Sequence, residues 1–153
     1  IQNTGDSNIA GESAYERASY YSKRKDWPEA EKRWTEFTAN KKWAGSRSPE
    51  AWYQLGKARD EQNKFPEALS AYVNVYGRYG SRIEYALPAV ARSAEIQNDL
   101  GEKEKAYRLA YVSGFKWAKY FDQYQTEYQI LRSIYVSLEG EYRKENDKDP
   151  FTN

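Results

Sequence analysis

The chain has 153 residues, among them 25 aromatic residues (5 Trp, 15 Tyr and 5 Phe) but no His, Cys or Met. The missing side chains exclude a Ser-His-Asp triad, a Cys nucleophile, an internal disulfide and a His/Cys zinc site. With 24 Lys and Arg against 23 Asp and Glu, the net charge of +1 provides no basic field of the kind that nucleic acid attracts. We therefore expect no nucleic-acid partner, no metal and no other cofactor, and the length suits one domain.

The two ends of the chain differ in composition from its middle. Residues 1–12 are rich in Asn, Ser, Gly and Asp and show no periodic apolar face, so we expect a flexible lead-in. From residue 13 to residue 146 the pattern is helical almost throughout, and residues 147–153 are expected to fray. No apolar stretch approaches the ~20 residues of a membrane-spanning helix. A first residue other than Met indicates a processed product or a fragment of a longer protein.

One short string recurs along the helical part of the chain. Asp-Trp-Pro-Glu-Ala at 26–30 is followed by Lys-Phe-Pro-Glu-Ala at 64–68 and, more distantly, by Glu-Lys-Glu-Lys-Ala at 102–106. The alanines that end these strings are each 38 residues apart. Because Pro fits the first turn of a helix, each string predicts the start of the second helix in a two-helix unit. The predicted units are about 13–47, 48–85 and 86–118.

A last predicted helix, about residues 119–146, follows these units. Its apolar residues recur in steps of three and four, which places them on one helical face. These residues are Phe121, Tyr124, Tyr128, Leu131, Tyr135 and Leu138. The pattern is typical of a long C-terminal capping helix of a repeat protein.

The middle unit resembles a known family. Its matches to the pattern Trp-x2-Leu-Gly…Ala-x3-Phe are Trp52, Leu55, Gly56, Ala68 and, in the Phe position, Tyr72. The chain is thus similar to tetratricopeptide-repeat (TPR) proteins. Its long linker at 42–49, which runs into Ser-Pro-x-Ala at 48–51, resembles those of periplasmic and outer-membrane-associated bacterial members. The resemblance implies an all-α, right-handed solenoid of three helix-turn-helix repeats of period 38 with the capping helix at its end.

The resemblance also implies a binding surface, because the first helices of TPR units line a concave groove. The residues that it places in this groove are Tyr15, Ser19, Tyr53, Lys57, Asp60, Arg92, Glu95 and Asn98. Trp43 and Tyr79 lie in the linkers, where the repeat pattern does not require a side chain to be buried. They form a second candidate surface at the linker edge. The aromatic face of the C-terminal helix is a candidate surface for homo-oligomers.

These features predict a non-enzymatic protein–protein interaction scaffold of a bacterial cell-envelope assembly, which binds a peptide or protein segment in the groove. The expected location is the periplasm, the cell envelope or the secreted fraction, with the cytoplasm as the alternative. Three other functions stay open. Exposed aromatic side chains would suit a glycan, peptidoglycan or polysaccharide ligand. If the chain is a fragment of a larger protein, it could act as a spacer between other domains. Asp60 and Glu95 could form the carboxylate pair of a helical enzyme domain.

Overall fold

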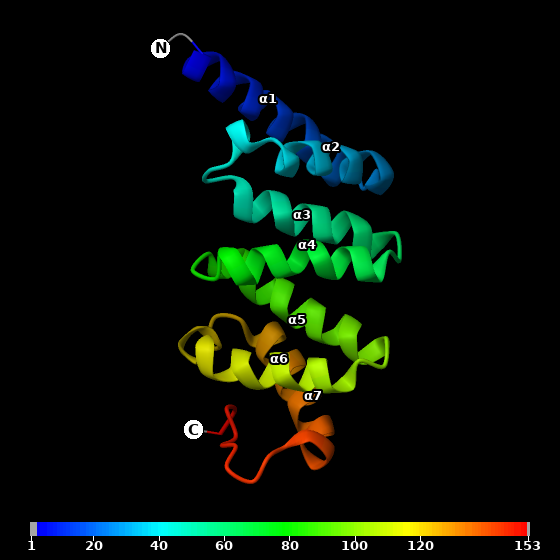
Figure 1. Cartoon of the computed structure of the whole chain (residues 1–153), viewed down its shortest axis with the longest axis vertical. Coiled ribbons are helices and arrows are strands. Elements are labelled where there is room, and N and C mark those ends of the chain that lie inside the picture. The colour runs from blue at the N-terminus through cyan, green and yellow to red at the C-terminus, as the bar shows by residue number, and fades with distance from the viewer. Residues whose placement is uncertain (1–2, 153) are drawn as a thin grey trace. The chain divides into compact units, whose positions relative to one another are not determined.

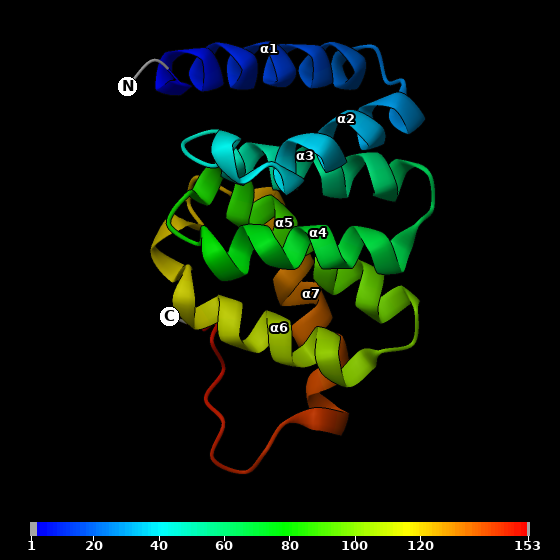
Figure 2. The ribbon, with the colours of Figure 1, turned by 45° about the horizontal axis from the view of Figure 1, so that its top comes forward.

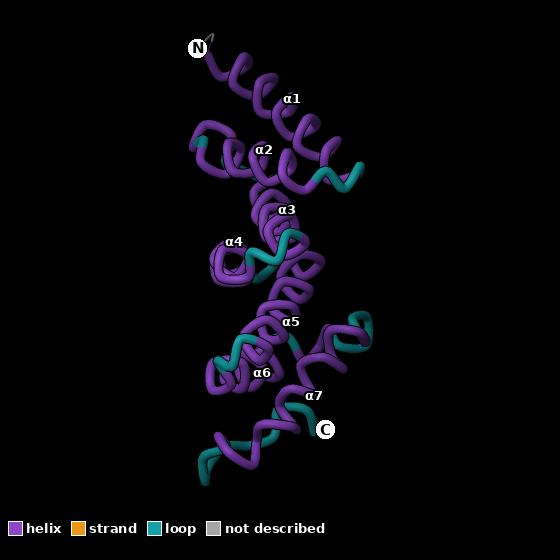
Figure 3. Tube along the Cα trace, turned by 90° about the vertical axis from the view of Figure 1, so that its right-hand side faces the viewer, coloured by secondary structure: helices purple, strands orange, loops and turns teal. Residues whose placement is uncertain are grey.

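The computed structural model describes residues 3–152, and all regular structure within them is helical. The contacts between helices divide the chain into two compact units, residues 1–79 and 80–153 (Figure 1). Figure 3 shows that short loops join the helices of each unit. No helix in the described range has both the length and the apolar character needed to cross a membrane.

The first unit consists of two helical hairpins. Its elements are α1 (Asn3–Lys23), α2 (Trp27–Ala39), the short 3-10 helix η1 (Lys41–Trp43), α3 (Ser48–Glu61) and α4 (Phe65–Arg78). Each α-helix packs on the next one along the chain, and α1 also contacts α3 and η1. The second residue of α2, α3 and α4 is a proline, which needs no hydrogen-bond partner in the first helical turn.

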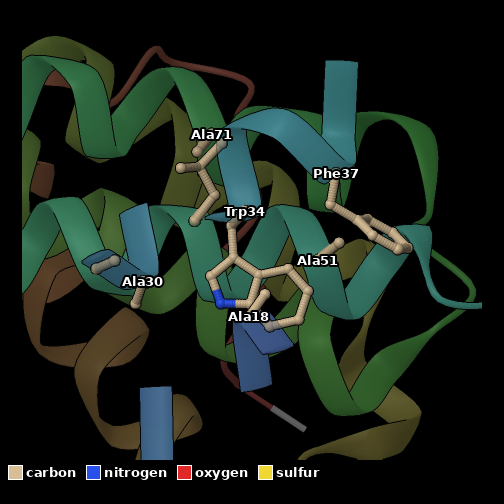
Figure 4. Close-up of a cluster of buried hydrophobic side chains, with 8 residues drawn as sticks. Ala18, Ala30, Trp34, Phe37, Ala51 and Ala71 are labelled. Atoms are coloured by element: carbon tan, nitrogen blue, oxygen red, sulfur yellow. The ribbon is translucent and has the colours of Figure 1, made fainter. Parts of the chain in front are cut away.

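A buried tryptophan organises the core of the first unit. Trp34 is fully buried among small side chains, including Ala18, Ala30 and Ala51, which allow three helices to approach one another closely (Figure 4). The indole N–H of Trp34 donates a hydrogen bond to Ser22 Oγ (2.8 Å), so its polar atom is satisfied. Burial of this one side chain removes roughly 150–250 Å² from water.

Glu31 on α2 joins the first hairpin of this unit to the second. Its carboxylate accepts hydrogen bonds from Arg59 Nε (3.2 Å), Gln62 Nε2 (3.1 Å) and Lys64 Nζ (2.8 Å). Burial acts to raise the pKa of Glu31, but these donors outweigh it and hold the pKa below its ordinary value. The carboxylate is therefore a charged link between α2 and the turn that follows α3.

The second unit contains three α-helices that all contact one another (Figure 2). Its elements are α5 (Ile83–Asp99), α6 (Lys103–Lys116), the 3-10 helix η2 (Ala118–Tyr120) and α7 (Gln125–Tyr142). Fully buried side chains from each helix meet in its core, among them Leu87 and Val90 from α5, Tyr107 from α6, and Leu131 and Tyr135 from α7.

The predicted 38-residue period appears in the turns between paired helices. Helices α2, α4 and α6 begin at residues 27, 65 and 103, each 38 residues after the last. The turn before each of them has one residue in the left-handed region: Lys25 (φ 59°), Asn63 (φ 60°) and Gly101 (φ 83°). The same pair of backbone hydrogen bonds closes each turn, for example Lys25 N–H to Ser22 O and Asp26 N–H to Tyr21 O, which is a Schellman motif.

The ends of two helices differ from the sequence-based expectation. Helix α1 begins at Asn3, so residues 3–12, expected to be a flexible lead-in, are helical. Near the end of this extension, Gly11 lies against the ring of Trp43, and an added Cβ there would be 3.1 Å from Cδ1 of that ring. Residues 1–2 of the expected lead-in lie outside the described residues.

The C-terminal helix is shorter than the predicted 119–146. A 3-10 turn takes up its start, and α7 ends at Tyr142, where Arg143 is extended (φ −63°, ψ 131°). Residues 147–153 are predicted to fray, but within the described range this segment packs back on the unit, and Phe151 is 9% exposed. Residue 153 lies outside the described residues.

Candidate functional site

The predicted groove residues lie on the first helix of each helical pair. Tyr15 and Ser19 are on α1, and Tyr53, Lys57 and Asp60 are on α3, all in the first unit. The other three, Arg92, Glu95 and Asn98, are on α5 in the second unit.

Tyr15 connects α1 to the start of α3. Its hydroxyl donates to the carboxylate of Glu50, 2.9 Å from Oε1 and 2.8 Å from Oε2. The guanidinium of Arg47 lies 4.0 Å from the centre of the Tyr15 ring, and the ring packs edge-on against Trp34. Burial and the hydrogen bond to Glu50 raise the pKa of Tyr15. These contacts give Tyr15 a structural role in the first unit.

The groove residues on α3 also contact the protein itself. Tyr72 of α4 donates its hydroxyl hydrogen to Asp60 Oδ2 (3.2 Å), and its ring centre lies 6.0 Å from that of Tyr53. Ser19 and Lys57 are half-buried. The structure therefore uses Tyr53 and Asp60 to hold α3 against α4.

The two linker aromatics are half-buried and do not stand out as an exposed pair. Trp43 in η1 packs against Phe37, with ring centres 5.8 Å apart, and against Gly11. Tyr79 follows α4 and lines a hollow of about 200 Å³ together with Trp52. Each ring is therefore partly packed against the first unit and partly accessible to solvent.

In the second unit, Glu95 and Asn98 come together in a hollow between α5 and α7. This hollow has a volume of about 340 Å³, and we name it the α5–α7 groove. Its lining residues are Glu95, Asn98 and Asp99 from α5, and Gln129, Ile130, Ser133 and Ile134 from α7. Arg92, the third predicted residue of this set, lies one turn earlier on α5, with its Nη1 atom 3.5 Å from Glu95 Oε1.

The groove combines a polar rim with an apolar floor. The carboxylates of Glu95 and Asp99 and the amide of Asn98 lie on the α5 side. On the α7 side, Ile130 is half-buried and Ile134 is buried, which gives an incoming side chain an apolar contact. Such a surface can accept hydrogen bonds and attract a positive charge while it covers an aliphatic group.

An internal contact shows which charge suits one end of the groove. The ammonium of Lys103, at the start of α6, donates a hydrogen bond to Asn98 Oδ1 (3.0 Å). Asp99, next to Asn98 in the chain, adds a carboxylate to the same lining. A cationic group is therefore already accommodated at this end.

The groove residues predicted from the sequence do not include the α7 side of this groove. The signal was present, because the 38-residue period carries the groove positions of Arg92 and Glu95 to Ile130 and Ser133. Both residues line the groove together with Gln129 and Ile134. The sequence pattern of this helix instead predicts a capping helix whose aromatic face packs on the core or contacts a second copy of the chain.

Comparisons of the chain with protein-family models, with curated proteins and with solved structures find no match. The basis for a function is therefore the chemistry of the groove together with the repeated helical pairs. A helical scaffold with a preformed hollow between neighbouring helices is one of the common settings for a binding site.

Proposed function

We propose that the protein is a non-enzymatic interaction scaffold, built as a TPR-like solenoid, that binds a protein segment in the α5–α7 groove. The observation that carries the proposal is the placement of Glu95, Asn98 and Asp99 opposite Ile130 and Ile134. The 38-residue spacing of the second helices and of their turns supports the repeat architecture. In such repeats the first helices of neighbouring units present one continuous row of side chains to a partner.

The size of the groove limits what it can hold. Ligand pockets usually measure about 300–1,000 Å³, so a hollow of about 340 Å³ takes a few side chains of a segment rather than a folded domain. Its charge favours a Lys or Arg side chain close to Glu95 and Asp99. Its floor favours an aliphatic neighbour of that side chain, which would lie on Ile130.

We further propose that this scaffold belongs to a bacterial cell-envelope assembly. The long linker that leads into the Ser-Pro start of α3 supports this assignment through its resemblance to the envelope members of the TPR family. In this chain the linker has a defined structure, because Gly45 N–H donates to Ser48 Oγ (2.9 Å) and both Ser48 and Pro49 are buried. The linker thus sets where α3 begins.

A peptide selection with two matched pairs of variants tests the proposed groove. Random decapeptides displayed on phage are selected on the full chain, and the recovered peptides are measured by fluorescence polarisation. Glu95→Gln removes one carboxylate from the groove, and Glu104→Gln removes one exposed carboxylate on α6. Ile130→Ser removes one of the two isoleucines of the apolar floor, and Val112→Ser makes a similar change at an exposed position of α6.

We expect the recovered peptides to pair Lys or Arg with an aliphatic residue. Glu95→Gln and Ile130→Ser should weaken their binding at least tenfold, or ~1.4 kcal/mol, while the two α6 variants should bind like the wild type. Equal binding to all four variants would show that the groove is not the site. Failure of the selection to recover any binder would also contradict the proposal.

A further inference from the structure

The C-terminal tail, residues 143–152, turns back after α7 and packs across α6 and α7. Figure 2 shows this segment, in red, returning to the C-terminal end of α6, in yellow. Two parts of the tail contact the helices, an acidic residue at 147 and a Pro-Phe pair at 150–151. Residues 144–146, just before the first of these, are exposed.

Asp147 is the acidic contact. Its carboxylate lies 3.6 Å from Arg108 Nη1 on α6 and accepts the backbone N–H of Lys144 (3.0 Å). Its carbonyl oxygen accepts two hydrogen bonds from the guanidinium of Arg143 (3.1 and 2.9 Å). Arg108 also donates to the carbonyl of Tyr142, so it holds both the end of α7 and the start of the tail.

Phe151 is the aromatic contact. Its ring lies among three aromatic rings, with centre distances of 6.0 Å to Phe121, 6.0 Å to Tyr128 and 5.5 Å to Tyr135. Beside this ring cluster, Gly114 of α6 leaves a notch for Pro150. A Cβ atom at position 114 would lie 2.6 Å from the Cβ of Pro150, so only a glycine fits this close approach. We name these four residues, Gly114 with the three rings, the tail pocket.

The bound part of the tail maintains its own shape. Asp149 Oδ1 accepts the backbone N–H of Phe151 (2.8 Å), and Thr152 Oγ1 donates to the carbonyl of Asp149 (3.2 Å). These bonds form a local turn around Pro150, whose fixed φ removes further freedom. The Asp-Pro-Phe sequence is therefore preorganised by contacts within itself, as expected of a short recognition motif.

We propose that the tail pocket is a second binding site, which recognises segments of the type Asp-x-Asp-Pro-Phe, and that the chain's own tail is its tethered ligand. A partner segment of the same chemistry binds when the tail opens at the exposed residues 144–146. The tail pocket shares no residue with the α5–α7 groove, so this inference does not depend on the proposed function. A short tether gives the tail an effective concentration in the millimolar range, and a free segment must compete with it.

A fluorescein-labelled peptide of residues 145–152 is the probe, and fluorescence anisotropy with the full chain is the measurement. Phe151→Ala in the protein empties the aromatic pocket and leaves its walls unchanged. We expect this variant to bind the peptide saturably and about 100-fold more tightly than the wild type, which must first release its own tail. A peptide with Ala in place of its Phe should not bind.

Two glycine variants in the Phe151→Ala background provide a matched control. Gly114→Ala fills the notch for Pro150 and should abolish binding, while Gly140→Ala on α7 has nothing within 4 Å of the added Cβ and should leave binding unchanged. Asp147→Ala, which keeps every residue of the tail pocket, replaces Phe151→Ala if that variant loses helical circular dichroism. The opened Asp147→Ala variant should also bind the peptide more tightly than the wild type.

Two results would overturn the proposal. One is a folded, tail-opened variant that does not bind the peptide. The other is a wild type that never binds the peptide even at millimolar concentration, because the tail would then be a fixed part of the fold.

Discussion

Replacing Gly56 by Ala tests how closely α3 and α4 pack. An added Cβ at position 56 would lie 2.5 Å from both Cδ1 and Cε1 of Tyr72. The Tyr72 side chain is only 2% exposed, and its hydroxyl is bonded to Asp60 on the same helix as Gly56. The ring therefore has little room to move away, since Tyr53 also packs against it.

Two opposing effects decide the result of this substitution. Ala is a better helix former than Gly by about 1 kcal/mol. Crowding a well-packed core costs about 1–3 kcal/mol. Here the crowded group is the ring of Tyr72, which Tyr53 and Asp60 hold in place. Because the ring has little room to move, we expect the crowding cost to lie near the upper end of this range, about 2–3 kcal/mol, which leaves a net loss of about 1–2 kcal/mol in the free energy of unfolding of the first unit.

Chemical denaturation followed by tryptophan fluorescence measures this loss of stability in the first unit. Four of the five tryptophans, those at 27, 34, 43 and 52, lie in the first unit. Gly77→Ala on α4 is the matched control, because nothing lies within 4 Å of its added Cβ, and it should stabilise the unit by about 0.5–1 kcal/mol. A Gly56→Ala variant as stable as the wild type, or more stable, would refute the packing argument.

The other predictions concern the repeated turns and the charged link of the first unit. Lys25 is exposed and has φ 59°, so Lys25→Gly should stabilise the folded protein by about 0.5–1 kcal/mol. Gly101 has φ 83°, so Gly101→Ala should destabilise it by about 1 kcal/mol. Thermal denaturation followed by circular dichroism measures both changes, and effects of equal sign would contradict the turn argument. Glu31→Gln should destabilise by about 1–2 kcal/mol at neutral pH, because Arg59 and Lys64 lose their carboxylate partner. Because the folded-state pKa of Glu31 lies below 4.5, this contribution is present above pH 4.5 and is lost as the pH falls through the lowered pKa. Urea unfolding of both proteins at pH 7 and pH 3 should show the difference shrink at acid pH, and a constant difference would contradict the charged link.

The parts of the fold that the sequence predicts are those set by local chemistry. The starts of α2 and α4 follow from a Pro in the first helical turn, and the period follows from identical turns before α2, α4 and α6. These signals act over a few residues, so a single sequence displays them. The all-helical character of the described residues confirms the coarse fold prediction, while the solenoid remains part of the proposed function.

The parts that the sequence does not predict depend on contacts between distant residues. Helix α1 extends to Asn3 past a glycine that packs against Trp43, 32 positions further along the chain. Phe151 is buried only because Gly114 and three aromatic rings form a pocket for it. In both cases the local composition is polar and gives no periodic signal, so the outcome depends on the tertiary partner.

After α7 the described residues do not continue the 38-residue pattern of paired helices. A fourth second helix, 38 residues after the start of α6, would begin at residue 141, and its turn would have its left-handed residue at 139. Instead α7 continues to Tyr142 and the extended tail follows. A helix in that place would cover the α6–α7 surface with a row of side chains, whereas the tail covers it mainly with Pro150 and Phe151.

Because the tail buries less apolar surface than a helix would, it is held less strongly. Burial of the Phe151 side chain contributes about 1.5–3 kcal/mol, and the conformational entropy lost when the tail backbone is ordered opposes this gain. The closed tail is therefore held by a few kcal/mol at most, so it can open while the core of α5, α6 and α7 stays folded. If the tail is as weakly held as this estimate indicates, the aromatic pocket around Phe151 is open to the partner segment proposed above.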